Sequence, residues 1–108
     1  MNNIQLIKFA AKAGRIEGRF IERMPEDGHP RYSCGIGNES STHLWNPLSV
    51  YGDALKLSVD LGIGIRHHQG WGEVFHPSVG EISFNYGDNA VLATCRAITT
   101  LAAEIGMK

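Results

Sequence analysis

The chain has 108 residues, of which 43% are hydrophobic and 19% are charged, and ten lysines and arginines against eleven aspartates and glutamates leave a net charge of −1. This balance excludes a disordered chain, which needs low hydrophobicity and a high net charge. It also argues against a protein that holds nucleic acid mainly by neutralising phosphates, because such domains carry a basic excess. The length predicts a single domain over residues 1–108.

The spacing of the apolar residues changes along the chain between the period of a helix and the period of a strand. In chain order it predicts a helix at 3–14, strands at 16–23 and 31–35, a helix at 52–63, strands at 63–68, 71–76 and 81–85, and a last helix at 89–105. The order α-β-β-α-β-β-β-α indicates an α+β fold. We expect about five antiparallel strands in one sheet, with three helices mainly on one face.

Capping residues mark the expected ends of the helices. Asn2 or Asn3 can cap the first helix, and Gly14 can supply its left-handed stop. Gly62 is expected to end the second helix, and Asp88 to cap the last one. The last helix has the clearest amphipathic pattern, with an apolar stripe formed by Val91, Cys95, Ile98, Ala102 and Ile105.

Two cysteines, Cys34 and Cys95, are the only candidates for a disulfide. The N-terminal segment does not have the apolar stretch of a secretory signal, and no apolar run approaches the ~18 residues that cross a bilayer. We therefore expect a cytoplasmic protein without membrane contact and without a stable disulfide. Because Cys95 lies on the apolar stripe of the last helix, we expect it to be a small buried hydrophobe.

The residues that could carry catalysis or hold a metal do not form a recognised pattern. None of the five histidines has metal-ligand spacing, and the neighbours His67 and His68 should point to opposite faces of a strand. No nucleophile elbow occurs, although Cys34 could still meet His43 in space. We expect no cofactor, no metal site and no catalytic residue, and a small enzyme ranks third among the hypotheses.

The second predicted hairpin carries the best candidate for a binding site. Trp71 lies between two glycines, which leaves its ring poorly shielded, as the aromatic anchors of interfaces often are. Arg66, His68 and Glu73 can point outward from the same hairpin. Trp45, which precedes Asn-Pro, is a lesser candidate. Each tryptophan could instead close one end of the core, and this alternative stays open.

Three segments of the chain resemble a group of small phage and prophage accessory proteins. The segments are WNPL at 45–48 with GDALKLSVDL at 52–61, LIKFAAKAG at 6–14, and the stretch 96–106 near the C-terminus. Together they cover somewhat under half of the chain. The resemblance implies a phage or prophage origin and a place in the cytoplasm of a bacterial host, and it implies no activity.

These observations predict a small, non-catalytic binding or regulatory protein that acts on a host or phage protein. The alternative is a small nucleic-acid-binding protein that uses the hairpin at 63–76, because cationic and aromatic side chains close together can stack on bases. An exposed edge strand would also allow two copies to pair as a homodimer.

Overall fold

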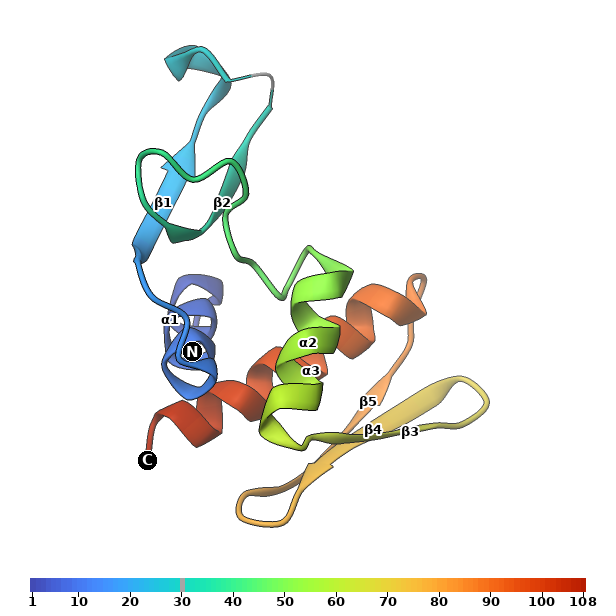
Figure 1. The fold of residues 1–108 in the computed structure, drawn as a ribbon. Helices are drawn as coiled ribbons and strands as arrows, with labels where there is room; N and C mark the ends of the chain where they lie inside the picture. The colour runs from blue at the N-terminus through green and yellow to red at the C-terminus, as the bar shows by residue number, and fades with distance from the viewer. Residues whose placement is uncertain (30) are drawn as a thin grey trace.

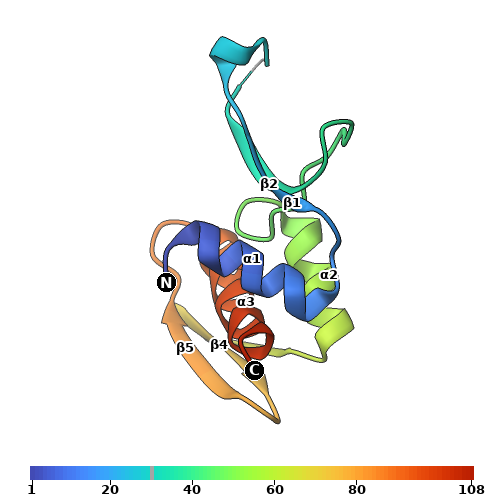
Figure 2. The same cartoon turned by 90° about the vertical axis from the view of Figure 1, so that its left-hand side faces the viewer.

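The computed structural model describes residues 1–29 and 31–108. Its elements are α1 (Asn3–Gly14), β1 (Arg19–Arg23), a short 3-10 helix η1 (Pro25–Asp27), β2 (Ser33–Gly37), α2 (Tyr51–Leu61), β3 (Gly64–His67), β4 (Trp71–His76), β5 (Gly80–Asn85) and α3 (Ala90–Gly106). The helices gather in the middle of the molecule, with β3, β4 and β5 on one side of them (Figure 1). The β1–β2 hairpin projects away from this body (Figure 2).

The predicted order of helices and strands is confirmed over these residues, but the strands form two sheets instead of one. Among the strands of the described residues, β1 pairs with β2, whereas β3, β4 and β5 form a separate three-stranded antiparallel sheet in chain order. The prediction of a single five-stranded sheet is therefore wrong. The reason is that the first hairpin has its own apolar cluster, in which Phe20 and Ile36 pack against Ile7 of α1. The apolar side chains of this hairpin are therefore buried against α1, and their burial does not require β1 or β2 to pair with β3 or β5.

α3 is the centre of the larger apolar cluster. It packs against α1 and α2, and also against β4 and β5 of the three-stranded sheet. The side chains of Leu101, Ala102 and Ala103 are completely buried. Val74 from β4 and Ala54 from α2 reach the same cluster. The helix with the clearest amphipathic pattern in the sequence is thus the one on which most of the core is built.

The ends of α1 show why local signals place a helix boundary only approximately. Asn2 caps the start, and its side chain and that of Gln5 exchange hydrogen bonds with each other's backbone N–H. The left-handed residue at the other end is Arg15 rather than Gly14. Gly14 stays helical, and a Cβ there would lie 2.8 Å from Cδ1 of Leu57. This glycine therefore allows α1 to approach α2 closely.

The other two helices end and begin close to the predicted positions. Gly62 ends α2 in the left-handed conformation with φ 72°, as predicted. α3 is capped by Asn89, whose side-chain oxygen accepts a hydrogen bond from the N–H of Leu92 at 3.0 Å. The cap is therefore one residue later than Asp88. Both residue types cap well, so the sequence alone could not separate the two positions.

The connection from β2 to α2 is held by polar contacts, most of them partly buried. The side chain of Asn46 donates to the carbonyl of Cys34 at 3.0 Å and accepts from the N–H of Leu48 at 3.0 Å. The N–H of Asn46 donates to Oδ2 of Asp53 at 2.9 Å, and Nε2 of His43 lies 2.8 Å from the same oxygen. The WNPL segment at 45–48 therefore fixes the entry into α2.

Replacing Asp53 with alanine should lower the free energy of unfolding by about 1–3 kcal/mol, because the partly buried N–H of Asn46 loses its acceptor. The matched control is Asp60→Ala, in the same helix. Asp60 forms an exposed ion pair with Lys56, so its loss should change the stability by less than about 0.5 kcal/mol. Urea denaturation of both variants measures the difference. Equal effects would show that Asp53 does not hold the connection.

Candidate functional site

Strand alternation divides the three-stranded sheet into two chemically different faces. The inner face carries Ile65, Val74 and Ile82, which belong to the larger apolar cluster around α3. Arg66 is paired directly with Glu73 in the register of β3 and β4, so both project from the opposite face. We call this opposite face of β3–β4 the outer sheet face, and its members are Arg66, His68, Trp71, Glu73 and Phe75.

Glu73 is the centre of the outer sheet face. Nε2 of His68 lies 2.7 Å from its Oε1, and Nη1 of Arg66 lies 3.8 Å from its Oε2. The carboxylate is largely buried beneath these partners, although it lies on the solvent side of the sheet. One acidic side chain thus contacts both an arginine and a histidine side chain.

Aromatic rings extend this arrangement at both ends. The imidazole of His68 stacks on the indole of Trp71, with ring centroids 4.0 Å apart and an interplanar angle of 18°. The guanidinium of Arg66 lies over the ring of Phe75, 4.5 Å from its centroid. Trp71 keeps 38% of its surface exposed. The result is a continuous row of ordered side chains with an accessible indole at one end.

The structure brings four of the five predicted contact residues together on the outer sheet face and places the fifth elsewhere. Trp45 packs against both apolar clusters, and its backbone forms an isolated bridge with Ile36. Trp45 therefore packs against the core, apart from the other four residues. The alternative that a tryptophan closes an end of the core applies to Trp45 and not to Trp71.

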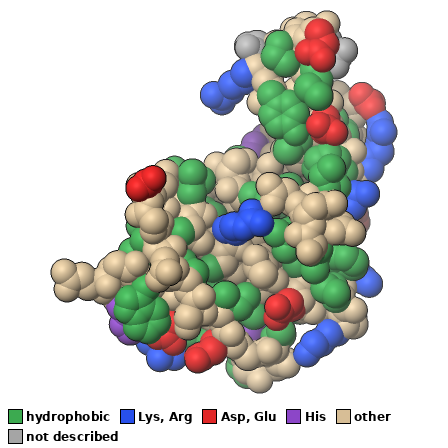
Figure 3. All heavy atoms as spheres, turned by 180° about the vertical axis from the view of Figure 1, so that it is seen from behind, with side chains coloured by type: hydrophobic (Ala, Val, Ile, Leu, Met, Phe, Trp, Pro, Cys, Tyr) green, Lys and Arg blue, Asp and Glu red, His purple; other side chains and the backbone are tan. Residues whose placement is uncertain are grey.

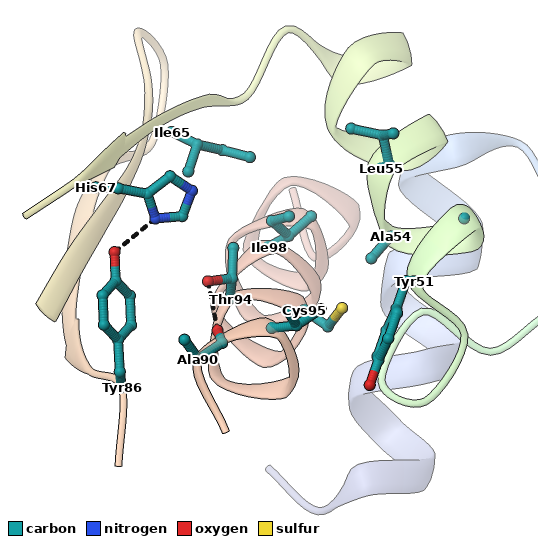
Figure 4. Close-up of a pocket in the computed structure, with 12 residues that line it drawn as sticks. Tyr51, Ala54, Leu55, Ile65, His67, Tyr86, Ala90, Thr94, Cys95 and Ile98 are labelled. Atoms are coloured by element: carbon teal, nitrogen blue, oxygen red, sulfur yellow. Dashed lines mark hydrogen bonds between the residues drawn. The ribbon is translucent and has the colours of Figure 1, made fainter. Parts of the chain in front are cut away.

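A second feature, which the sequence did not predict, is a groove of about 470 Å³ on the other side of β3. We call it the α2–α3 groove. It is lined by residues of α2, β3, the β5–α3 connection and the first half of α3, namely Tyr51, Gly52, Ala54, Leu55, Ile65, His67, Tyr86, Ala90, Val91, Thr94, Cys95 and Ile98. Figure 4 shows α3 as its floor, with α2 and β3 as opposite walls.

The lining of the groove is mostly apolar, with a few polar groups at its edge. Nδ1 of His67 and the hydroxyl of Tyr86 are hydrogen bonded at 2.6 Å. The hydroxyl of Thr94 already donates to the carbonyl of Ala90 at 2.8 Å. Burial raises the pKa of the Cys95 thiol, which keeps the sulfur protonated and uncharged. The thiol is buried, as its place on the apolar stripe predicted.

The groove exists because the apolar stripes of α2 and α3 are wider than the surfaces that cover them. Val91 belongs to the predicted stripe of the last helix, yet it is half exposed. Leu55 is 62% exposed on the side of α2 that faces the same space. Leu55 lies outside the part of α2 that Ala54 and Leu57 bury in the core, and an apolar residue there is the one sequence signal of the groove.

Within residues 1–29 and 31–108, no three histidine, cysteine, aspartate or glutamate side chains gather closely enough to bind a metal ion together. None of the helices in these ranges has the length and apolar character needed to cross a membrane.

Comparison of the chain with protein-family models, with curated proteins and with solved structures finds no match. The similarity to phage and prophage proteins seen in three segments of the sequence stays a prediction.

Proposed function

We propose that this chain is a non-catalytic binding or regulatory module, of phage or prophage origin, that docks a host or phage protein through its outer sheet face. In this proposal it acts in the cytoplasm of the bacterial host. The observation that carries the proposal is the ordered row from Phe75 to Trp71, which is complete before any partner arrives.

Preorganisation is what makes such a row suited to binding. A free arginine or histidine side chain loses rotamer freedom when a partner fixes it, and this loss weakens association. Here Glu73 and the two flanking rings already hold Arg66 and His68 in place. Tryptophan and arginine are also the residue types that most often dominate the energy of protein interfaces.

The charges on this face favour a protein partner over nucleic acid. Glu73 lies beside Arg66, the one arginine of the outer sheet face, and Glu81 of β5 stands opposite Phe75 on the same face. Basic and acidic side chains are also interspersed over the back of the molecule (Figure 3). Binding through phosphates needs a surplus of positive charge, which the outer sheet face does not offer.

The test is affinity purification of the tagged chain from its bacterial host, with the bound protein and nucleic acid both identified. We expect the intact chain to retain one protein in constant proportion, and Trp71→Ala to weaken that complex at least about tenfold. The loss of the stack on His68 should lower the free energy of unfolding by only about 1 kcal/mol.

Tyr51→Ala is the matched control, because Tyr51 is equally an exposed aromatic residue but lies on α2, away from the outer sheet face. It should leave the complex unchanged. Retention of the partner by Trp71→Ala would overturn the proposal. Recovery of nucleic acid alone, with binding that weakens steeply as salt is added, would establish the alternative function. Recovery of a second copy of the chain would identify a homodimer in its place.

A further inference from the structure

We propose that the α2–α3 groove is a binding site for a small, uncharged, planar aromatic molecule that carries a hydrogen-bond acceptor. This site is separate from the outer sheet face and does not depend on the function proposed for it. The two surfaces lie on opposite sides of β3, because Ile65 and His67 face the groove while Arg66 faces outward.

The size and lining of the groove fit a small molecule. Its volume of about 470 Å³ falls in the range of ligand pockets, which are concave, mainly apolar and provided with a few polar groups. Leu55 and Val91 stand at the mouth from two different helices, and both keep about half or more of their surface in water. A ligand between them would remove this apolar surface from solvent, which is favourable.

The charge of the ligand follows from what the lining lacks. None of the described residues that line the groove is a lysine, arginine, aspartate or glutamate. The raised pKa of Cys95 keeps the thiol at the floor neutral as well. A charged molecule would lose its hydration in the groove without gaining a counter-charge, and this is costly. The groove therefore selects an uncharged ligand.

We infer that the ligand carries a hydrogen-bond acceptor because the hydrogen bond between His67 and Tyr86 leaves one donor of this pair unused. If the phenol donates to Nδ1 of a neutral imidazole, Nε2 carries the proton and is free to donate. If Nδ1 donates to the phenol oxygen, the phenol hydrogen is free to donate. In either arrangement the pair keeps one donor for a ligand. Figure 4 shows the His67 ring beside Ile65, with the nitrogen that is not bonded to Tyr86 turned toward the groove.

The planar shape follows from the aromatic side chains at the two ends of the groove. Tyr51 of α2 stands at one end, and His67 with Tyr86 stands at the other (Figure 4). Aromatic side chains bind flat molecules by stacking or by edge-to-face contact, with a preference that aliphatic side chains do not have. A flat ligand can therefore contact the rings while its acceptor meets the donor of the His67–Tyr86 pair.

The probe for this site is prodan, a neutral naphthalene ketone whose fluorescence shifts to the blue in apolar surroundings. We expect a saturable shift with one site per chain. Leu55→Asp and Val91→Asp should each weaken binding at least about tenfold, because the ligand would then bury a carboxylate. Val59→Asp and Leu92→Asp are the matched controls, since both are exposed apolar residues of the same two helices outside the groove. The controls should stay within about twofold of the intact chain.

The hydrogen-bond donor of the His67–Tyr86 pair is tested separately with the double variant His67→Phe, Tyr86→Phe. It should weaken prodan about fivefold through the loss of one hydrogen bond, and it should not weaken the matching dimethylaminonaphthalene without the ketone. Thermal melts of all variants verify that they are folded, and Leu55 is exposed enough that Leu55→Asp should fold normally. Binding that does not saturate, or that falls equally in the Val59 and Leu92 controls, would overturn the site. If the double variant weakens both probes equally, the claim that the His67–Tyr86 pair recognises an acceptor on the ligand is overturned.

Discussion

Replacing Leu101 with alanine is expected to lower the free energy of unfolding by about 2–5 kcal/mol. Leu101 is 0% exposed in the middle of α3, the helix that contacts α1, α2 and the three-stranded sheet. Truncation removes apolar contacts with the surrounding elements and leaves a cavity among them. The neighbours Ala102 and Ala103 are too short to fill it, so little of the lost packing can be recovered.

Urea denaturation measures this loss, with Leu92→Ala as the control. Leu92 lies on the same helix with 39% of its surface exposed, and its truncation should cost less than about 1 kcal/mol. A large change for Leu101 with an unchanged dependence on denaturant would confirm a loss of stability within the same fold. Similar costs at the two positions would contradict the central place of α3 in the core.

The outer sheet face could be predicted because it depends on a pattern of period two. Residues 63–76 contain a turn between two short alternating segments, and antiparallel pairing across that turn determines which side chains share a face. Arg66, His68 and Glu73 therefore come together when the two strands pair across this turn. The stacking of His68 on Trp71 could not be predicted, because the alternation of a strand does not determine the rotamers of its side chains.

The two sheets could not be predicted because they depend on contacts between distant segments. Nothing in the residues of β1 and β2 states whether the hairpin pairs with β3 or packs on α1. The outcome is decided by the apolar cluster that Ile36 and Phe20 form with Ile7. The α2–α3 groove was hidden for the same reason, since an apolar stripe shows which side of a helix avoids water but not how completely a neighbour covers it.

β3 connects the two surfaces that we assign to binding. Arg66 lies on the outer sheet face, and its neighbours Ile65 and His67 line the α2–α3 groove. A slip of one residue in the pairing of β3 with β4 would exchange the two sets of side chains. The strand follows directly on the buried Ile63 and the left-handed Gly62, so both surfaces lie next to the end of α2.

Replacing Gly35 with alanine is expected to lower the free energy of unfolding by about 2–4 kcal/mol. Gly35 has φ 154°, which side chains disfavour, and a Cβ there would lie 2.4 Å from the carbonyl oxygen of Trp45. The backbone at this point is held by two hydrogen bonds between Ile36 and Trp45, at 2.8 and 2.9 Å. Alanine must therefore push the two segments apart and break the bridge that precedes the buried Asn46.

The loss at Gly35 has two causes, the strain of a positive φ and the contact of the new Cβ with Trp45, and Gly70→Ala separates them. Gly70 has φ 83°, but a Cβ there would meet nothing within 4 Å, so its replacement carries the backbone strain alone, about 1 kcal/mol. Denaturation of the two variants under the same conditions should show the larger loss for Gly35. If the losses are equal, the contact between β2 and the backbone of Trp45 does not contribute to stability, and the position of Trp45 between the two apolar clusters must be maintained by its side chain alone.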